Sequence, residues 1–166
     1  MSKSVRKKSV RKNAFIRALA TGTAVSALSF LIAAAEAGEN VSGKSPAISL
    51  PTSTGASDSL ANHKGDVVMV NFWASWCEPC RTEFPLIDGL YKKYKKLGFT
   101  VLAINIEPDS KAAQGFLKNT PVSFPVLLDS KNTISDTYKV EAMPTTVMID
   151  RNGNMRFLHR GYQPGY

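Results

Sequence analysis

The sequence predicts an α/β domain in which helices flank a mixed central sheet, and three observations lead to this prediction. Residues 67–73 form a continuous apolar, β-branched run that is typical of a strand buried on both faces. Residues 84–97 repeat apolar side chains at three- and four-residue steps, which indicates an amphipathic helix. Residues 99–104 form a second apolar run, and because a helix separates the two runs, we expect parallel strands.

The other elements follow in chain order. Residues 38–54 are rich in Ser, Gly, Pro and Thr and indicate a linker with a short edge strand near 47–50, ahead of a domain at 55–166. Pro79 suits the first turn of the helix, and Gly98 suits its end. Further helices are expected at 111–118 and 133–138, and further strands at 124–128, 145–149 and 155–159. Asp150-Arg151-Asn152-Gly153 is a turn signal that predicts an antiparallel hairpin for the last two strands.

Residues 1–37 have the pattern of a signal peptide. Seven of the 21 basic residues lie in the first 17 positions, with no acidic residue among them. Eighteen uncharged residues follow, and Ala35-Glu36-Ala37 is a small-x-small site where a signal peptidase could cut before Gly38. An N-terminal membrane anchor is the alternative, because 18 residues approach the length of a bilayer span. In either case we expect the folded part outside the cytoplasm, periplasmic or tethered to the membrane, where disulfides persist.

Composition and charge narrow the function classes. The chain has 43% hydrophobic and 20% charged residues, as globular proteins do, and a formal net charge of +8. Without residues 1–37, 14 Lys and Arg remain against 12 Asp and Glu. A net charge near +2 gives no support for nucleic-acid binding. We expect a monomer that uses no metal or cofactor.

The two cysteines of the chain form the motif Cys77-Glu78-Pro79-Cys80 between the first buried strand and the helix. This position puts Cys77 at the helix N-terminus, where free N–H groups and the helix dipole favour a thiolate. Cys77 is therefore the expected nucleophile. Cys80 lies inside the first turn and is expected to be the resolving thiol that attacks a mixed disulfide at Cys77.

Two other uses of the cysteine pair remain as alternatives. A metal site would need two more ligands, and neither His63 nor His159 lies at ligand spacing from the cysteines. A purely structural disulfide that closes so short a loop would remove little entropy from the unfolded chain. Redox exchange is the favoured interpretation.

Three segments match a known pattern: residues 72–81 (Phe-Trp-Ala-Ser-Trp-Cys-Glu-Pro-Cys-Arg), Glu83-Phe84-Pro85, and Met143-Pro144-Thr145-Thr146. Together they resemble the thioredoxin superfamily, and more narrowly its exported TlpA/ResA/CcmG branch of thiol-disulfide reductases. The resemblance covers about Ser45 to Tyr166. It implies a thioredoxin-like fold.

The resemblance also implies roles outside the cysteine pair. Pro144 matches the cis-proline that lies against the active-site disulfide, and it would leave the backbone of Met143 free to pair with an extended substrate chain. Trp76 matches an aromatic residue beside the nucleophile. With Met143 and Thr145 it is the expected docking surface, and a partly exposed core residue is the alternative for Trp76.

One position departs from the superfamily pattern. Cytosolic thioredoxins keep a buried Asp where this sequence has Asn71. Glu83, one turn after Cys80, matches an acidic residue of the ResA-like branch, and we expect it to modulate the pKa values of the cysteine pair and to assist proton transfer. The alternative is a Glu that is favoured near a helix start by the helix dipole.

The charges near the motif predict the direction of electron flow. Negative charge disfavours a thiolate and so favours the disulfide, and Glu78 and Glu83 lie near the pair, with Arg81 as a partial offset. We therefore expect a reductant in an oxidising compartment. The resemblance implies a membrane thiol donor of the DsbD/CcdA type, and acceptors such as apocytochrome c or copper-site proteins. A disulfide oxidase or isomerase of the same fold is the alternative.

Thioredoxin-like domains usually end in a helix that covers one face of the sheet. Here residues 161–166 stand where that helix would begin. The sequence therefore predicts either a fold without the C-terminal helix or a truncated chain, and a truncated chain would leave apolar sheet surface exposed.

Overall fold

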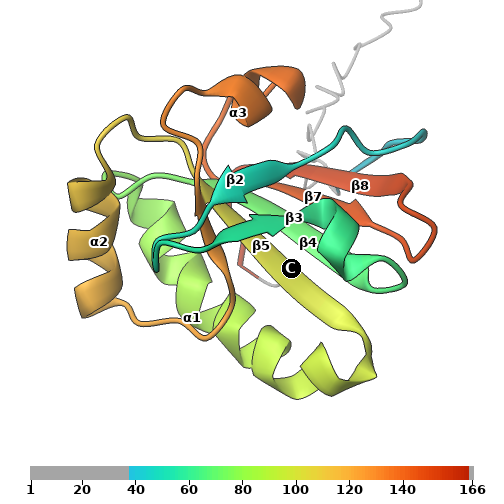
Figure 1. Cartoon of the computed structure of the whole chain (residues 1–166), viewed down its shortest axis with the longest axis horizontal. Coiled ribbons are helices and arrows are strands. Elements are labelled where there is room, and N and C mark those ends of the chain that lie inside the picture. Colours follow the sequence, from blue (N-terminus) through green and yellow to red (C-terminus); the bar gives the residue numbers. More distant parts are fainter. Residues whose placement is uncertain (1–37, 165–166) are drawn as a thin grey trace, which may run out of the picture. The chain divides into compact units, whose positions relative to one another are not determined.

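The structure is a computed structural model, and it describes residues 38–164 (Figure 1). The predicted signal peptide or anchor, residues 1–37, lies outside the described residues. Within residues 38–164, no helix is long and apolar enough to cross a membrane.

Within residues 38–164 the central sheet has six strands: β1 (Glu39–Asn40), β4 (Val67–Trp73), β5 (Phe99–Asn105), β6 (Val126–Leu128), β7 (Thr145–Ile149) and β8 (Met155–Arg160). Their order across the sheet is β1-β8-β7-β4-β5-β6. Strands β4, β5 and β6 are parallel, whereas β7 and β8 form an antiparallel hairpin beside β4. The predicted mixed sheet, the parallel pair and the C-terminal hairpin are confirmed.

The helices of the described region are α1 (Glu78–Tyr94), α2 (Ser110–Asn119) and α3 (Thr133–Thr137), with short 3-10 helices η1 (Leu60–His63) and η2 (Lys95–Leu97). Cys77 caps the start of α1, and Pro79 lies in its first turn, as predicted. Gly98 follows η2 with φ +76°, a backbone conformation that glycine adopts at little cost. The chain can therefore turn directly into β5.

The segment 38–54 is more structured than a linker. Its first residues form the edge strand β1, which pairs with β8. The predicted strand near 47–50 is β2 (Ser49–Pro51), and it pairs with β3 (Ser57–Ser59) in a separate two-stranded sheet. The expectation of one edge strand after a linker is corrected accordingly, because pairing with a distant strand leaves no periodic signal in so short a segment.

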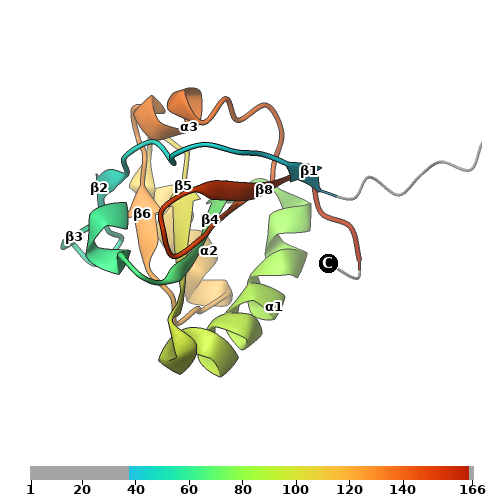
Figure 2. The same cartoon turned by 90° about the vertical axis from the view of Figure 1, so that its right-hand side faces the viewer.

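Two apolar clusters fill the two faces of the central sheet. One lies beneath α1 and α2 and includes Trp73, Phe84, Phe116 and both cysteines. The other lies on the opposite face and includes Ile48 and Phe72. Figure 2 shows α1 on one side of the sheet and the β2–β3 hairpin on the other. Consecutive residues of β4 point to opposite faces, so Phe72 and Trp73 enter different clusters.

The apolar stripe expected on the helix is buried only in its first half. The later positions are exposed: Leu90, Tyr94 and Leu97. Asp88 is buried instead, because its carboxylate accepts hydrogen bonds from the backbone N–H and the hydroxyl of Ser123 at 2.7 and 2.6 Å. Lys92 also pairs with Asp88 at 2.5 Å. Apolar periodicity does not reveal a buried carboxylate that is satisfied by a distant loop.

Apolar surface of the described residues is open beside α1. Residues 161–164, after β8, form no helix. A cavity of about 160 Å³ lies there, lined by Met69, Leu86, Leu90 and Met148 among others, and both leucines are exposed.

Phe84 lies at the centre of the cluster beneath α1, and we predict that Phe84→Ala lowers the free energy of unfolding by about 3–5 kcal/mol. Its ring centroid lies 4.7 Å from that of Trp73, 5.2 Å from that of Phe116 and 5.5 Å from that of Phe124. Denaturant titration measures the loss. The matched control is Phe157→Ala on β8, where the side chain is 46% exposed and a loss below about 1 kcal/mol is expected. Equal losses at the two sites would contradict the assigned packing.

Candidate active site

The cysteine pair lies where β4 ends and α1 begins. Cys77 and Cys80 form a disulfide, and Cys77 is the N-cap of α1. The Cys77 Sγ accepts the backbone N–H of Cys80 at 3.2 Å, and the same N–H would stabilise a Cys77 thiolate after reduction. Cys77 is 4% exposed and Cys80 is fully buried. Of the pair, only Cys77 therefore keeps any exposure to solvent.

The cis-proline loop lies at the same edge of the sheet. The Met143–Pro144 peptide bond is cis, as the resemblance implies. Pro144 directly precedes β7, and Thr145 at the start of β7 pairs with Phe72 near the end of β4. Met143 packs against the apolar cluster that contains both cysteines. The cysteine pair and the cis-proline loop, about 65 residues apart in the sequence, thus lie close together in the fold.

Glu83 belongs to a small polar cluster inside the sheet–helix interface. Asn71 is fully buried in the middle of the sheet, and its Nδ2 donates to Glu83 Oε2 at 3.1 Å and to Thr146 Oγ1 at 2.9 Å. Thr146 comes from the strand beside β4, where it pairs with Asn71. Glu83 also lines the open cavity beside α1, which gives its carboxyl group a route for proton exchange with solvent.

Burial raises the pKa of Glu83 from its ordinary 4.5 to about 7, although the hydrogen bond from Asn71 opposes the shift. Near neutral pH the carboxyl group is therefore present in both protonation states. The buried Oδ1 of Asn71 has no hydrogen-bond donor among residues 38–164. A protonated Glu83 could donate to it after rotation of the amide, so Asn71 can serve either form of the acid.

The expected docking residues differ in exposure. Trp76 is 68% exposed directly before Cys77, which removes the core-residue alternative for its side chain. Met143 is half-buried. Thr145 is only 2% exposed, and its hydroxyl donates to the carbonyl oxygen of Ala142 at 2.7 Å. Its side chain holds the cis-proline loop and offers no surface to a partner.

Sequence reasoning misses Glu107, which lies on the loop after β5. One carboxylate oxygen accepts from the Ser75 hydroxyl at 2.7 Å, and the other accepts from the Ser75 backbone N–H at 2.7 Å and from Asn105 Nδ2 at 2.9 Å. The available signal is an acidic residue two positions after the end of a buried parallel strand. The carboxyl ends of β4 and β5 meet at one edge, so this acid falls beside the cysteine loop.

The other acid of the motif lies in solvent. Glu78 forms an exposed ion pair with Arg81 at 3.4 Å, which contributes little to stability. The Arg81 guanidinium also lies 4.7 Å from the ring centroid of Phe116. The charge of Glu78 near the disulfide is therefore partly balanced.

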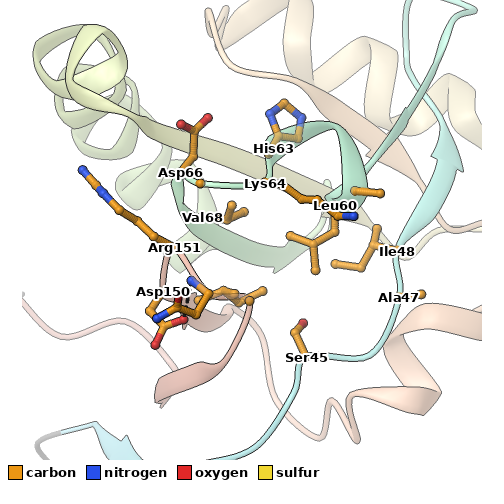
Figure 3. Close-up of a pocket in the computed structure, with 15 residues that line it drawn as sticks. Ser45, Ala47, Ile48, Leu60, His63, Lys64, Asp66, Val68, Asp150 and Arg151 are labelled. Atoms are coloured by element: carbon orange, nitrogen blue, oxygen red, sulfur yellow. Dashed lines mark hydrogen bonds between the residues drawn. The ribbon is translucent and has the colours of Figure 1, made fainter.

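Within the described range 38–164, no group of three His, Cys, Asp or Glu side chains could hold a metal ion. A larger cavity, of about 370 Å³, lies at the opposite end of β4 (Figure 3). Ile48, Leu60 and Val68 contribute its apolar lining, with Lys64 and Arg151 among its charged residues. Val68 is the second residue of β4, whereas the cysteine loop follows the end of that strand, so this cavity is not part of the cysteine site.

The raised pKa of Glu83 predicts a pH-dependent stability that Glu83→Gln removes. Below pH 4.5 Glu83 is protonated in both the folded and the unfolded protein, so its ionisation does not lower the free energy of unfolding. Between pH 4.5 and 7 it ionises first in the unfolded chain, so wild-type stability falls as pH rises, by on the order of 3 kcal/mol in all. We therefore expect the difference in free energy of unfolding between the oxidised Glu83→Gln protein and wild type to shift in favour of the variant between pH 4 and pH 8. Denaturant titrations at each pH measure this difference. Glu78→Gln, at an exposed acid on the same helix, should show no such gain, and a flat Glu83→Gln difference would contradict the assigned burial.

The chain is similar in sequence to a protein family and to curated thiol-disulfide oxidoreductases. A family model described as Redoxin matches residues 40–165. Thiol-disulfide oxidoreductase ResA of Bacillus subtilis (strain 168) is 37% identical over 110 residues, which cover 66% of this chain and 62% of that protein. For the first three curated relatives, the matched part spans between 53% and 62% of their length.

Solved structures show the same fold. A candidate thiol:disulfide interchange protein DsbE from Chlorobium tepidum matches with a TM-score of 0.72 at 39% identity, over 77% of this chain and 89% of that one. A secreted Mycobacterium tuberculosis disulfide oxidoreductase homologous to E. coli DsbE matches with a TM-score of 0.61 at 25% identity, over 66% of this chain and 81% of that one. The fold is thioredoxin-like. Because the family model spans the cysteine pair, the cis-proline and all strands from β4 to β8, the chain belongs to the Redoxin family, among its ResA- and DsbE-like members.

Proposed function

We propose that this protein is an extracytoplasmic thiol-disulfide oxidoreductase that reduces disulfides of exported proteins. The observation that carries the proposal is the Cys77–Cys80 disulfide at the start of α1, at the same sheet edge as the cis-proline loop. The names of the ResA- and DsbE-like relatives agree with this chemistry.

The first step is attack by Cys77. In the reduced protein its thiolate attacks one sulfur of a substrate disulfide, forms a mixed disulfide with that sulfur, and expels the other as a thiolate that takes a proton from solvent. The backbone N–H groups at the start of α1 stabilise the Cys77 thiolate before the attack.

The second step is resolution by Cys80. The Cys80 thiol loses its proton and attacks Cys77 Sγ, so the Cys77–Cys80 disulfide forms and the second substrate thiolate leaves. Two electrons have then passed to the substrate, and an external dithiol must return them. Glu83 is one helical turn from Cys80, and its pKa of about 7 suits a group that accepts this proton at neutral pH.

Substrate docking uses the surface around Cys77. Trp76 offers an exposed ring beside the nucleophile, and the half-buried Met143 lies before the cis-proline. An extended substrate segment would pair with the backbone of Met143 while its apolar side chains contact Trp76. Thr145 supports this arrangement from inside the loop.

Reduction is the proposed direction of electron flow. Glu78 keeps a negative charge near the pair, but Glu83 is only partly ionised at neutral pH, so the electrostatic bias against the thiolate is weaker than two full charges would give. The proposed compartment is outside the cytoplasm, in keeping with the signal-like residues 1–37 and with the secreted relative. A membrane thiol donor of the DsbD/CcdA type would supply electrons, and apocytochrome c is one candidate substrate.

Trapping tests the assigned order of the cysteines. We expect reduced Cys80→Ser to form a stable mixed disulfide with an oxidised peptide that carries a C-x-x-C-H disulfide, because the resolving thiol is missing. Intact-mass analysis before and after reduction measures the adduct, and peptide mapping places it on Cys77. The matched Cys77→Ser protein should give no adduct, and trapping through Cys80 in that variant would reverse the assignment.

The reduction potential tests the direction. Equilibration of the domain with glutathione or dithiothreitol buffers should give a potential below about −200 mV, since strong periplasmic oxidants lie near about −120 mV. A value near the latter would favour the oxidase or isomerase alternative. Glu78→Gln should raise the potential slightly, because removal of a nearby negative charge stabilises the thiolate.

A further inference from the structure

Glu107 connects the end of β5 to the loop that carries the nucleophilic cysteine. Its carboxylate accepts both the backbone N–H and the hydroxyl of Ser75, two residues before Cys77, each at 2.7 Å. The same loop is closed by a hydrogen bond from the Cys77 N–H to the Ala74 carbonyl oxygen at 3.1 Å. Glu107 thus holds the first half of a short turn whose second half ends at Cys77.

The carboxylate is itself held in place by buried groups. Asn105 is fully buried at the end of β5, where it pairs with Trp73 at the end of β4. Its Nδ2 donates to Glu107 Oε2 at 2.9 Å, and its Oδ1 accepts the Glu107 backbone N–H at 3.1 Å. Asn105 therefore fixes Glu107 to the central sheet, and Glu107 in turn holds Ser75 in the cysteine loop. We call Asn105, Glu107 and Ser75 the Glu107 clamp.

We propose that Glu107 is a positioning residue that keeps Cys77 at the N-terminus of α1 in a geometry suited to attack. This inference rests on the proposed thiol-disulfide exchange. The Cys77 sulfur receives the Cys80 N–H only while the loop holds Cys77 in the N-cap position. A loop released from Glu107 would sample other positions, with a less stabilised thiolate and fewer productive encounters.

Glu107 could act on Cys77 by positioning it or by its negative charge, and the two roles change the pKa of Cys77 in opposite directions. A carboxylate near a thiol raises the thiol pKa, so its removal would lower the pKa of Cys77 if charge were all that mattered. Loss of positioning would raise the pKa of Cys77, because the helix N–H groups would no longer meet the sulfur. Glu107→Gln removes the charge but keeps one acceptor oxygen for the Ser75 N–H, whereas its amide nitrogen can donate to the Ser75 hydroxyl.

The experiment measures two quantities on the reduced full chain and its variants. One is the pH dependence of alkylation of Cys77 by iodoacetamide, with the alkylated residue located by peptide mapping. The other is the second-order rate constant for exchange with an oxidised C-x-x-C-H peptide. For Glu107→Ala we expect a raised pKa of Cys77 and a loss in rate of about tenfold or more. Glu107→Gln should stay within about threefold of wild type, and Ser75→Ala, which keeps the backbone bond, should fall between the two.

Each other outcome overturns the proposal. A pKa of Cys77 that falls equally in Glu107→Ala and Glu107→Gln assigns the residue a charge effect only. Lower thermal stability with unchanged pKa and rate assigns it a structural role only. If Glu107→Ala does not fold, Ser75→Ala at the rate and pKa of wild type is the contradicting result. Should wild type itself fail to exchange with the peptide, the proposed function fails, while the alkylation profiles still decide the role of Glu107.

Discussion

The structure depends on the position of β4 between a parallel and an antiparallel neighbour. Its parallel register with β5 brings Glu107 to the end of β4, and its antiparallel register with β7 brings the cis-proline loop to the same edge. The cysteine loop leaves β4 at that edge, and α1 begins there. A register slip of one residue would turn every buried side chain of β4 to the wrong face, so the apolar core and the site are specified together.

Two polar side chains between the sheet and α1 lower the stability of the fold but also serve the site. Asn71 and Glu83 occupy places where apolar side chains would pack without loss, and the raised pKa of Glu83 expresses the desolvation of its charged form. The same desolvation moves the titration of this acid into the range where thiols exchange protons. Stability lost at neutral pH and a carboxyl group suited to proton transfer are thus two consequences of one buried position.

Sequence reasoning located most elements because their signals are local. The apolar run of β4, the Gly98 stop and the Asp150–Gly153 turn depend on neighbours within a few residues, and each lies where expected. Sequence reasoning failed where contacts between residues far apart in the chain determine the structure. The edge strand β1 forms by pairing with β8, and Asp88 can be buried because Ser123 donates a hydrogen bond to its carboxylate. Leu90 is exposed although its spacing predicts burial, because no described element packs over that part of α1.

The sequence by itself placed the cysteine pair at a helix start, because the motif lies between two locally recognisable elements. Its resemblance to the thioredoxin superfamily pointed to the cis bond before Pro144 and to the acid one turn after Cys80. Only the folded chain decided which oxygens and hydrogens meet across 32 residues from Ser75 to Glu107 and 75 residues from Asn71 to Thr146. Hydrogen bonds of this kind require two backbones to be fixed first, and in this protein the pairing of β4 with β5 and β7 fixes them.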